Sequence, residues 1–352
     1  MKINMESLMT DVVVPINEDL VKKLIKEYGM MAKNTSIIKV GENLDLPMLV
    51  KNYWNIDELN KASGETGNKV LEMVDQITDF YKQNGTYKTM KNGKSYINNL
   101  QFGWYTFQSW NLQNDKKYAE DEISHRFYFN ASFRELPELM ESLITIYSKM
   151  NEPFYFKVNS AFELGCKDAL VLYCSTKQLN NTLNVLSEIE KEKPELVKKL
   201  SNPHFLTGNI NNWVSYASEN KLIKGKSYTS IMAKCCIESF ENSVSEWIKE
   251  NPSYSVEHEN EILLLKDYFN GSLKNSNVRD MDVMKNNYYY IYRLGHLISV
   301  LPEVDPLFID RIIDNLKKSV KKYNILSENI CFNSDVLTEM IDLNIRRNKV
   351  SS

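Results

Sequence analysis

Two short segments carry residues suited to binding an anion and to moving a proton. Segment 125–130 reads His-Arg-Phe-Tyr-Phe-Asn, and segment 154–159 reads Phe-Tyr-Phe-Lys-Val-Asn. Both alternate with a period of two, which predicts β-strands with one apolar and one polar face. If the strands share a sheet, its polar face gathers a cation, a phenol and an amide from each strand. These polar candidates are Arg126, Tyr128, Asn130, Tyr155, Lys157 and Asn159.

An ordinary solvated strand face is the competing interpretation of these positions. Their side chains, however, are large hydrogen-bonding types rather than the small and charged mixture of a typical outer face. Lys157 is flanked by Phe156 and Val158, and apolar surroundings lower the pKa of a lysine by penalising its charged form. A nearby Arg126 would lower that pKa further by like-charge repulsion. We therefore expect Lys157 to be neutral near pH 7 and able to act as a general base.

A second candidate for anion binding is segment 225–230, Gly-Lys-Ser-Tyr-Thr-Ser, before a helix expected to run to about Lys249. Backbone N–H groups at the start of a helix attract anions. An ordinary N-cap at Ser227 or Thr229 is the more common use of such residues, and the spacing is not that of a Walker loop. The binding candidates of this region are Lys226, Ser227, Ser230 and Lys234.

The elements around these segments predict an α+β fold. A helix over 136–150 separates the two strands, and the apolar run in 168–173 predicts a central strand buried on both faces. A helix over 179–189 follows, and then a polar, irregular stretch at 207–212. We expect a small, mainly antiparallel central sheet flanked by helices, with helical N-terminal and C-terminal parts.

Composition restricts the function classes. The chain has 352 residues and a formal net charge of −3, which offers no broad attraction to nucleic acid or to an anionic membrane. No apolar run is long enough to span a bilayer, and the first residues lack the apolar region of a signal peptide. Five cysteines without a CxxC pair indicate reduced thiols and a cytoplasmic location. We expect parts 1–118, 119–252 and 253–352 to pack as one compact unit.

Four segments in a fixed order resemble the HopA-type effector family over about residues 120–250. They are Arg126–Asn130, Phe156–Val158, Lys167–Tyr173 and Lys226–Lys234. The family is named from a plant-pathogen effector and is similar to the phosphothreonine lyases. Its relatives also accompany a separate kinase-like protein in gene clusters for ribosomally made peptides, including class V lanthipeptides and thioamitides. The resemblance thus implies a phosphorylated precursor peptide and a kinase-like protein as partners.

The resemblance implies a lyase that needs neither metal nor cofactor and that eliminates phosphate from phosphoserine or phosphothreonine. Lys157 would remove the α-proton, while Asp168 would position Lys157 or a cation. Arg126, Lys234 and the Ser227–Ser230 segment would hold the phosphate. Tyr128 would protonate or orient the leaving oxygen. The product would be dehydroalanine or dehydrobutyrine in the peptide.

The sequence departs from the family pattern at three places. Cys166 or Lys167 stands where an arginine is usual, and segment 227–234 lacks the family's glycine and arginine. Phosphothreonine lyases carry a Lys-x-His pair in the first strand, where this chain has Arg126 and Tyr128. On this resemblance, the proton would come from Tyr128 or from His125 on the other face of the strand, or phosphate would leave without an acid because it is itself a good leaving group. A non-catalytic HopA-like effector, or a peptide-binding partner protein, is the alternative function.

Overall fold

The computed structural model describes residues 4–33, 98–101, 104–108, 123–132, 135–150, 152–159, 168–222, 227–252 and 295–351. The chain divides into two compact units built from segments that are distant in sequence. The first unit combines Met1–Val14, Asp57–Tyr228 and Asn324–Ser352, and the second combines Pro15–Ile56 and Thr229–Tyr323. The sequence-based division at 118 and 252 follows chain order, whereas each compact unit joins an early segment to a late one.

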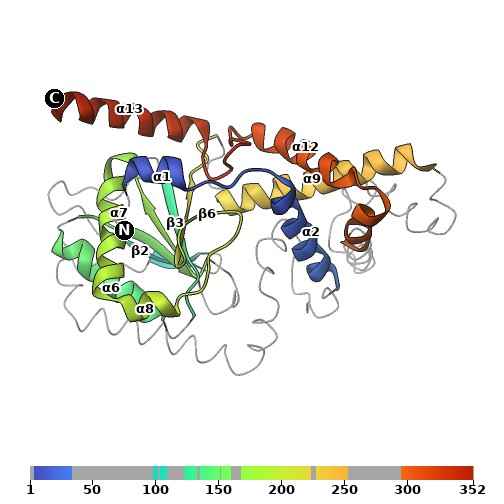
Figure 1. The fold of residues 1–352 in the computed structure, drawn as a ribbon. Helices are drawn as coiled ribbons and strands as arrows, with labels where there is room; N and C mark the ends of the chain where they lie inside the picture. The colour runs from blue at the N-terminus through green and yellow to red at the C-terminus, as the bar shows by residue number, and fades with distance from the viewer. Residues whose placement is uncertain are drawn as a thin grey trace, which may run out of the picture. The chain divides into compact units, whose positions relative to one another are not determined.

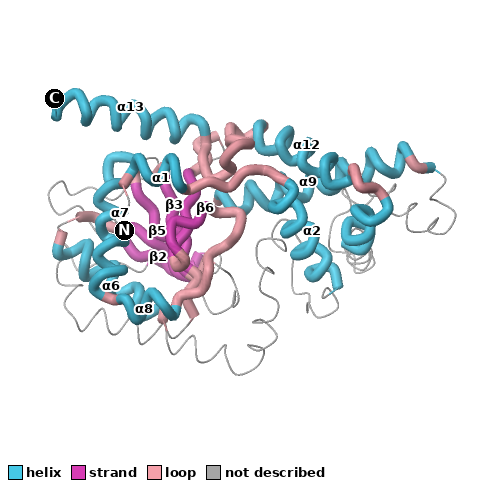
Figure 2. Tube along the Cα trace, viewed as in Figure 1, coloured by secondary structure: helices cyan, strands magenta, loops and turns pink. Residues whose placement is uncertain are grey.

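The first unit is built around a sheet (Figures 1 and 2). Within the described residues this sheet has seven strands in the order β1-β2-β4-β5-β3-β7-β6, and every neighbouring pair is antiparallel. The strands are β1 (Asn98–Gln101), β2 (Trp104–Gln108), β3 (His125–Phe129), β4 (Tyr155–Asn159), β5 (Leu170–Cys174), β6 (Gly208–Asn211) and β7 (Val214–Ser218). Together with the surrounding helices, this sheet confirms the α+β class.

Helices cover the apolar face of the sheet. In the first unit they are α1 (Met5–Asp11), α6 (Leu136–Lys149), α7 (Leu179–Glu192), α8 (Pro194–Lys199) and α13 (Ser334–Ser351), with a short 3-10 helix, η5 (Thr176–Gln178). One hydrophobic core joins Phe127, Phe156 and Leu172 of the sheet to residues of α1, α6, α7, α8 and α13. Burying this apolar surface is the main force that holds the helices on the sheet.

The two segments that opened the sequence analysis form β3 and β4, and both lie in the same sheet. They are not neighbours, because β5 lies between them and pairs with each. All five residues of β5 are buried, which confirms the expected central strand. The polar residues of β3 and β4 therefore lie on one face of the sheet but are separated by the width of β5.

The expectation of an irregular stretch at 207–212 was wrong. Residues Gly208–Asn211 form β6, which makes a hairpin with β7 at the edge of the sheet. Asparagine is uncommon in strands, but the polar residues of an edge strand can face water on its open side. Gly208 is required by close packing, since a Cβ atom there would collide with Val12 and lie 2.9 Å from the Cys331 Sγ.

The second unit is helical in its described part. It contains α2 (Glu18–Lys33), α12 (Phe308–Lys321), helical residues 295–304 and all but the first residue of α9 (Tyr228–Glu250). Helices α2 and α12 pack together, and both bury apolar residues. Of the helices described in either unit, none is both long and apolar enough to cross a bilayer.

Candidate functional site

The candidate site lies on the polar face of the sheet, opposite the helix-covered core. Strand register places Arg126 beside Tyr173, and Tyr173 beside Tyr155. In the next row Tyr128 lies beside Val171, and Val171 beside Lys157. Directly paired residues share a face of an antiparallel sheet, so the side chains of Arg126, Tyr128, Tyr155 and Lys157 share one face. None of them belongs to the hydrophobic core cluster.

Tyr173 lies at the centre of this face and contacts both cations. The Arg126 Cζ lies 5.0 Å from the centroid of the Tyr173 ring, and the Lys157 Nζ lies 5.6 Å from the same centroid. The Tyr155 ring lies 4.8 Å from the Tyr173 ring and 5.8 Å from the Lys157 Nζ. A cation within about 6 Å of an aromatic centroid is attracted by the ring's quadrupole. The tyrosine pair, which is buried, thus holds a guanidinium and a lysine amine on one face of the sheet.

Arg126 is fixed by a second contact, an ion pair between its Nε and the Glu219 carboxylate. Both side chains are mostly buried, at 13% and 14% exposed. Burial lowers the pKa of Arg126, but the charge of Glu219, followed by those of Tyr173 and Tyr128, outweighs it and raises this pKa above its usual value. Arg126 is therefore a permanent positive charge on the face.

Tyr128 carries a buried hydroxyl group that has no hydrogen-bond partner among the described residues. The residue is 1% exposed. Burial raises the pKa of Tyr128 well above its ordinary value, Arg126 opposes the rise, and Glu219, Tyr173 and Asp168 add to it. The hydroxyl is thus a protonated donor. An unpaired buried polar group costs about 1–3 kcal/mol, so a group that accepts its hydrogen bond would be stabilised there.

The arrangement combines a guanidinium, a lysine amine and a phenol hydroxyl on one face of the sheet, with the Tyr173 ring next to the guanidinium and the amine. Such a set can bind an oxyanion through Arg126, donate a hydrogen bond from Tyr128 and, with a neutral Lys157, remove a proton. Across the described residues there is no group of three His, Cys, Asp or Glu side chains arranged to hold a metal ion.

The other predicted site residues of the first unit lie outside the cluster formed by Arg126, Tyr128, Tyr155 and Lys157. Asn130 follows β3 in an isolated bridge with Ser201, and its side-chain amide donates to the Asn202 carbonyl at 2.9 Å. Asp168 is buried just before β5, close enough to raise the pKa of Tyr128. Asn159 is the last residue of β4, and Ser227 precedes α9 and is half-buried.

The remaining candidates come from the region of α9. Lys226 lies outside the described residues, and Ser230 and Lys234 belong to the second unit. The Lys234 Nζ lies 3.8 Å from a Glu238 carboxylate oxygen and 5.8 Å from the Tyr323 ring centroid. A hydrogen bond with Tyr323 is the largest cause of the raised pKa of Lys234. Lys234 is thus engaged with an acidic and an aromatic neighbour of its own unit.

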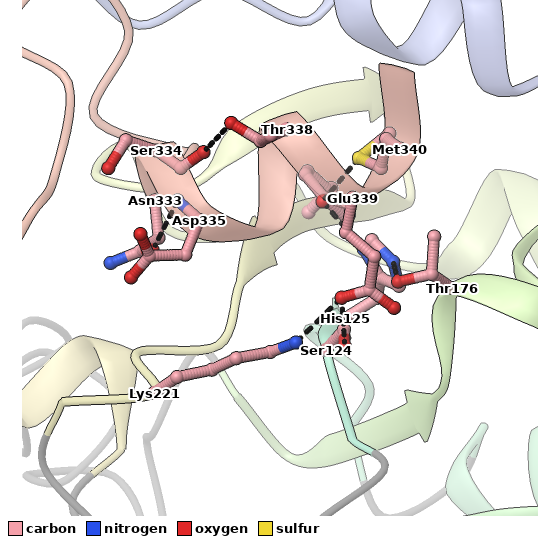
Figure 3. Close-up of polar contacts among 11 residues, drawn as sticks. Ser124, His125, Thr176, Lys221, Asn333, Ser334, Asp335, Thr338, Glu339 and Met340 are labelled. Carbon is pink, nitrogen blue, oxygen red and sulfur yellow. Dashed lines mark hydrogen bonds and ion pairs between the residues drawn. The ribbon is translucent and has the colours of Figure 1, made fainter. Parts of the chain in front are cut away.

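His125 lies on the apolar face and cannot act on a ligand of the polar face. Its Nδ1 shares a hydrogen bond of 2.8 Å with the Tyr216 hydroxyl, and its Nε2 shares one of 3.1 Å with Thr176 Oγ1. Nearby, Glu339 of α13 pairs with Lys221 at 2.6 Å (Figure 3). The alternative that His125 supplies the proton is therefore wrong, because strand alternation directs its ring into the core. The role of Tyr128 as the acid stays a prediction.

Acid is expected to destabilise the first unit through His125. Full burial lowers the pKa of His125 from 6.5 to about 3, and the charge of Lys221 lowers it while that of Glu339 opposes the change. Between these values the unfolded chain binds a proton that the native chain does not, so stability falls as the pH drops below about 6.5. The slope for one group is at most about 1.4 kcal/mol per pH unit. Urea unfolding from pH 7 to pH 5 should show this loss.

A His125→Gln variant provides the comparison, because glutamine retains hydrogen-bonding groups but does not titrate. We expect its unfolding free energy to depend less on pH than that of the wild type. His296→Gln is the matched control, because His296 is exposed. Equal pH slopes in the wild type and both variants would contradict the assignment.

The sequence analysis missed two residues of the site, Tyr173 and Glu219. Tyr173 was placed on the central strand but was not assigned to the polar face. It lies two residues after Val171, so the two side chains share a face of the strand, and this spacing was a signal in the sequence. Glu219 follows β7 directly, and β7 was not predicted. The alternation in Val214–Ser218 of Val, Tyr and Ser with Ser and Ala could have indicated that strand.

A comparison with family models gives a match over the middle of the chain. Residues 98–247 match the model of the HopA1 effector protein family, so the resemblance to the HopA-type family is confirmed over this part of the chain. The matched segment contains all seven strands and most of α9. A solved structure of an effector protein from Pseudomonas syringae pv. tomato strain DC3000 is 15% identical, with a TM-score of 0.35, over 62% of this chain and 87% of that one. Comparison with curated proteins gave no match.

Proposed function

We propose that this protein is a phosphoserine/phosphothreonine lyase that uses the polar face of the sheet. The observation that carries the proposal is the buried Tyr128 hydroxyl, which has no hydrogen-bond partner in the described residues and shares its face with Arg126 and Lys157. An unpaired donor beside the Arg126 guanidinium and the Lys157 amine suits an anionic leaving group better than it suits a structural role.

The proposed reaction is a β-elimination. The neutral amine of Lys157 takes the α-proton of the phosphorylated residue, and the electrons of the Cα–H bond form the Cα–Cβ double bond. The Cβ–O bond breaks, and its electron pair leaves with the phosphate. Arg126 binds the phosphate oxygens, while Tyr128 donates a hydrogen bond to the leaving oxygen. The proton removed from Cα finally resides on the released phosphate, so no other reactant is consumed.

The substrate in this proposal is a ribosomally made precursor peptide that a separate kinase-like protein has phosphorylated. The product then contains dehydroalanine or dehydrobutyrine, as in lanthipeptide-like biosynthesis. The family match over residues 98–247 is to an effector family, and the choice of substrate rests on the resemblance drawn from the sequence motifs. A neighbouring kinase-like gene together with a small Ser/Thr/Cys-rich precursor gene would support it independently.

The test is to incubate the full chain with a phosphothreonine peptide, without added metal, and to follow the peptide by mass spectrometry. Loss of phosphoric acid is the expected result. If several phosphopeptides keep their mass, the reaction is repeated with the products of the neighbouring genes. Unchanged phosphopeptide there as well would overturn the proposal.

A non-catalytic peptide-binding protein is the second candidate, and the charge balance of the described face favours it. The positive Arg126 is paired with the negative Glu219, so this ion pair carries no net charge before a ligand binds. A neutral ion pair beside two tyrosine rings offers no net charge to a phosphate group, which favours an unphosphorylated peptide. Equal affinity for a peptide and its phosphothreonine form would support this candidate over the lyase.

A further inference from the structure

We infer that Glu219 is a positioning residue that orients Arg126 toward the oxyanion of the ligand. The inference rests on the proposed function, because it assigns the role of Glu219 through the phosphate-binding role of Arg126. The sequence analysis assigned neither β7 nor Glu219 to the site. The pairing of β7 with β3 brings Glu219 next to Arg126.

Strand register explains why the two side chains meet. Arg126 pairs with Ala217 of β7, and Glu219 lies two residues further along the chain, on the same side as Ala217. The Glu219 N–H donates to the Ser124 carbonyl at 2.8 Å, which extends the pairing past the end of β7. Glu219 is therefore a diagonal cross-strand neighbour of Arg126, within reach of a long side chain.

Among the described residues, the contact fixes the guanidinium through its Nε and does not use the two Nη nitrogens. The Glu219 carboxylate accepts from Nε, and the Tyr173 ring lies 5.0 Å from Cζ. Because the guanidinium is a rigid plane, a bond at Nε and a ring beside it set the direction of the two Nη nitrogens. We assign these nitrogens to the phosphate. An unanchored arginine would lose rotamer entropy when it binds, which weakens affinity.

The opposite role would be competition, in which Glu219 neutralises Arg126 and repels an anion. The two roles predict opposite results for Glu219→Ala. Loss of a positioning residue weakens phosphate binding, whereas loss of a competitor strengthens it. Near-complete burial of the pair favours positioning, because a charged arginine without its carboxylate would be costly to keep in a buried site.

The experiment measures the affinity of a fluorescent phosphothreonine peptide by anisotropy. Glu219→Ala should raise the dissociation constant by about tenfold, which corresponds to the loss of one charge-assisted hydrogen bond. Glu219→Gln keeps an oxygen acceptor for Nε and should restore most of the affinity. In an Arg126→Gln background, Glu219→Ala should change the affinity no further, since its effect is transmitted through Arg126.

Lys221→Ala is the matched control, because it removes the ion pair with Glu339 near the same end of β3, where Ser124 also contacts Glu339. It should leave the affinity unchanged, and thermal unfolding would verify that each variant is folded. Unchanged or tighter binding by Glu219→Ala would overturn the inference, as would a further loss in the Arg126→Gln background. A wild type that binds the phosphopeptide without eliminating phosphate would overturn the lyase alone, and one that does not bind it would overturn both.

Discussion

Replacing Lys157 with alanine is expected to reduce phosphate elimination by roughly 100- to 10,000-fold, the usual contribution of a general base. Phosphopeptide binding should survive, because Arg126 remains anchored between Glu219 and Tyr173. Lys157 lies at the end of the aromatic pair, 5.6 Å from the Tyr173 centroid, where its amine faces the same side of the sheet as Arg126. Single-turnover mass spectrometry and peptide anisotropy would separate the two effects.

Lys157→Arg distinguishes the base from a simple positive charge. Arginine keeps the charge but stays protonated at any working pH, so it can bind phosphate without removing a proton. We expect this variant to bind the peptide and to fail in elimination. Lys149→Ala is a suitable control, because Lys149 lies in an exposed ion pair with Glu192. Normal turnover in Lys157→Ala would exclude the proposed mechanism.

Replacing Tyr128 with phenylalanine is expected to slow elimination by about 100-fold while leaving the fold as stable as before or more stable. The rate falls because the leaving oxygen loses its hydrogen-bond donor. Stability is retained because the hydroxyl that is removed has no hydrogen-bond partner among the described residues, and such a group costs about 1–3 kcal/mol when buried. Urea unfolding and elimination kinetics on the same preparation would measure both quantities.

Tyr216→Phe is the matched control. Tyr216 lies on β7, which pairs with β3, and its side chain faces the hydrophobic core rather than the site. Its hydroxyl is bonded to His125 at 2.8 Å, and the side chain is fully buried. Tyr216→Phe should therefore lower the unfolding free energy by about 1 kcal/mol and leave elimination unchanged. If Tyr128→Phe behaved like Tyr216→Phe, the Tyr128 hydroxyl would have a structural rather than a functional role.

Alternation along single strands determined the two faces of the site from the sequence alone. In β3 and β4 the large apolar residues occupy every second position, and water drives those residues into one core. Arg126, Tyr128, Tyr155 and Lys157 therefore had to share the other face once both strands joined one sheet. The apolar run of β5 likewise indicated a central strand, because a strand covered on both faces carries few polar residues.

Strand order and register were decided by the tertiary structure. The sequence does not state that β5 separates β3 from β4, or that β7 pairs with β3, because each pairing depends on contacts between distant segments. For that reason Glu219 was missed and the contact of Tyr173 with Arg126 was not predicted, although both residues hold Arg126 in place. The polar hairpin of β6 and β7 resembles a loop locally, and its pairing with β3 makes β7 a buried strand.

The tertiary structure also separated candidates that lie close together in the sequence. Ser227 belongs to the first unit and comes just before α9. Lys234 belongs to the second unit, where it pairs with Glu238 and lies over the Tyr323 ring. His125 and Arg126 are adjacent in sequence, yet one is buried in the core and the other lies on the site face. The sequence by itself thus determined which residues of one strand share a face, since that follows from local backbone geometry. Long-range packing alone decided which strands pair and which carboxylate contacts Arg126. These contacts join segments that are far apart in the chain, so their free energy cannot be judged from either segment by itself.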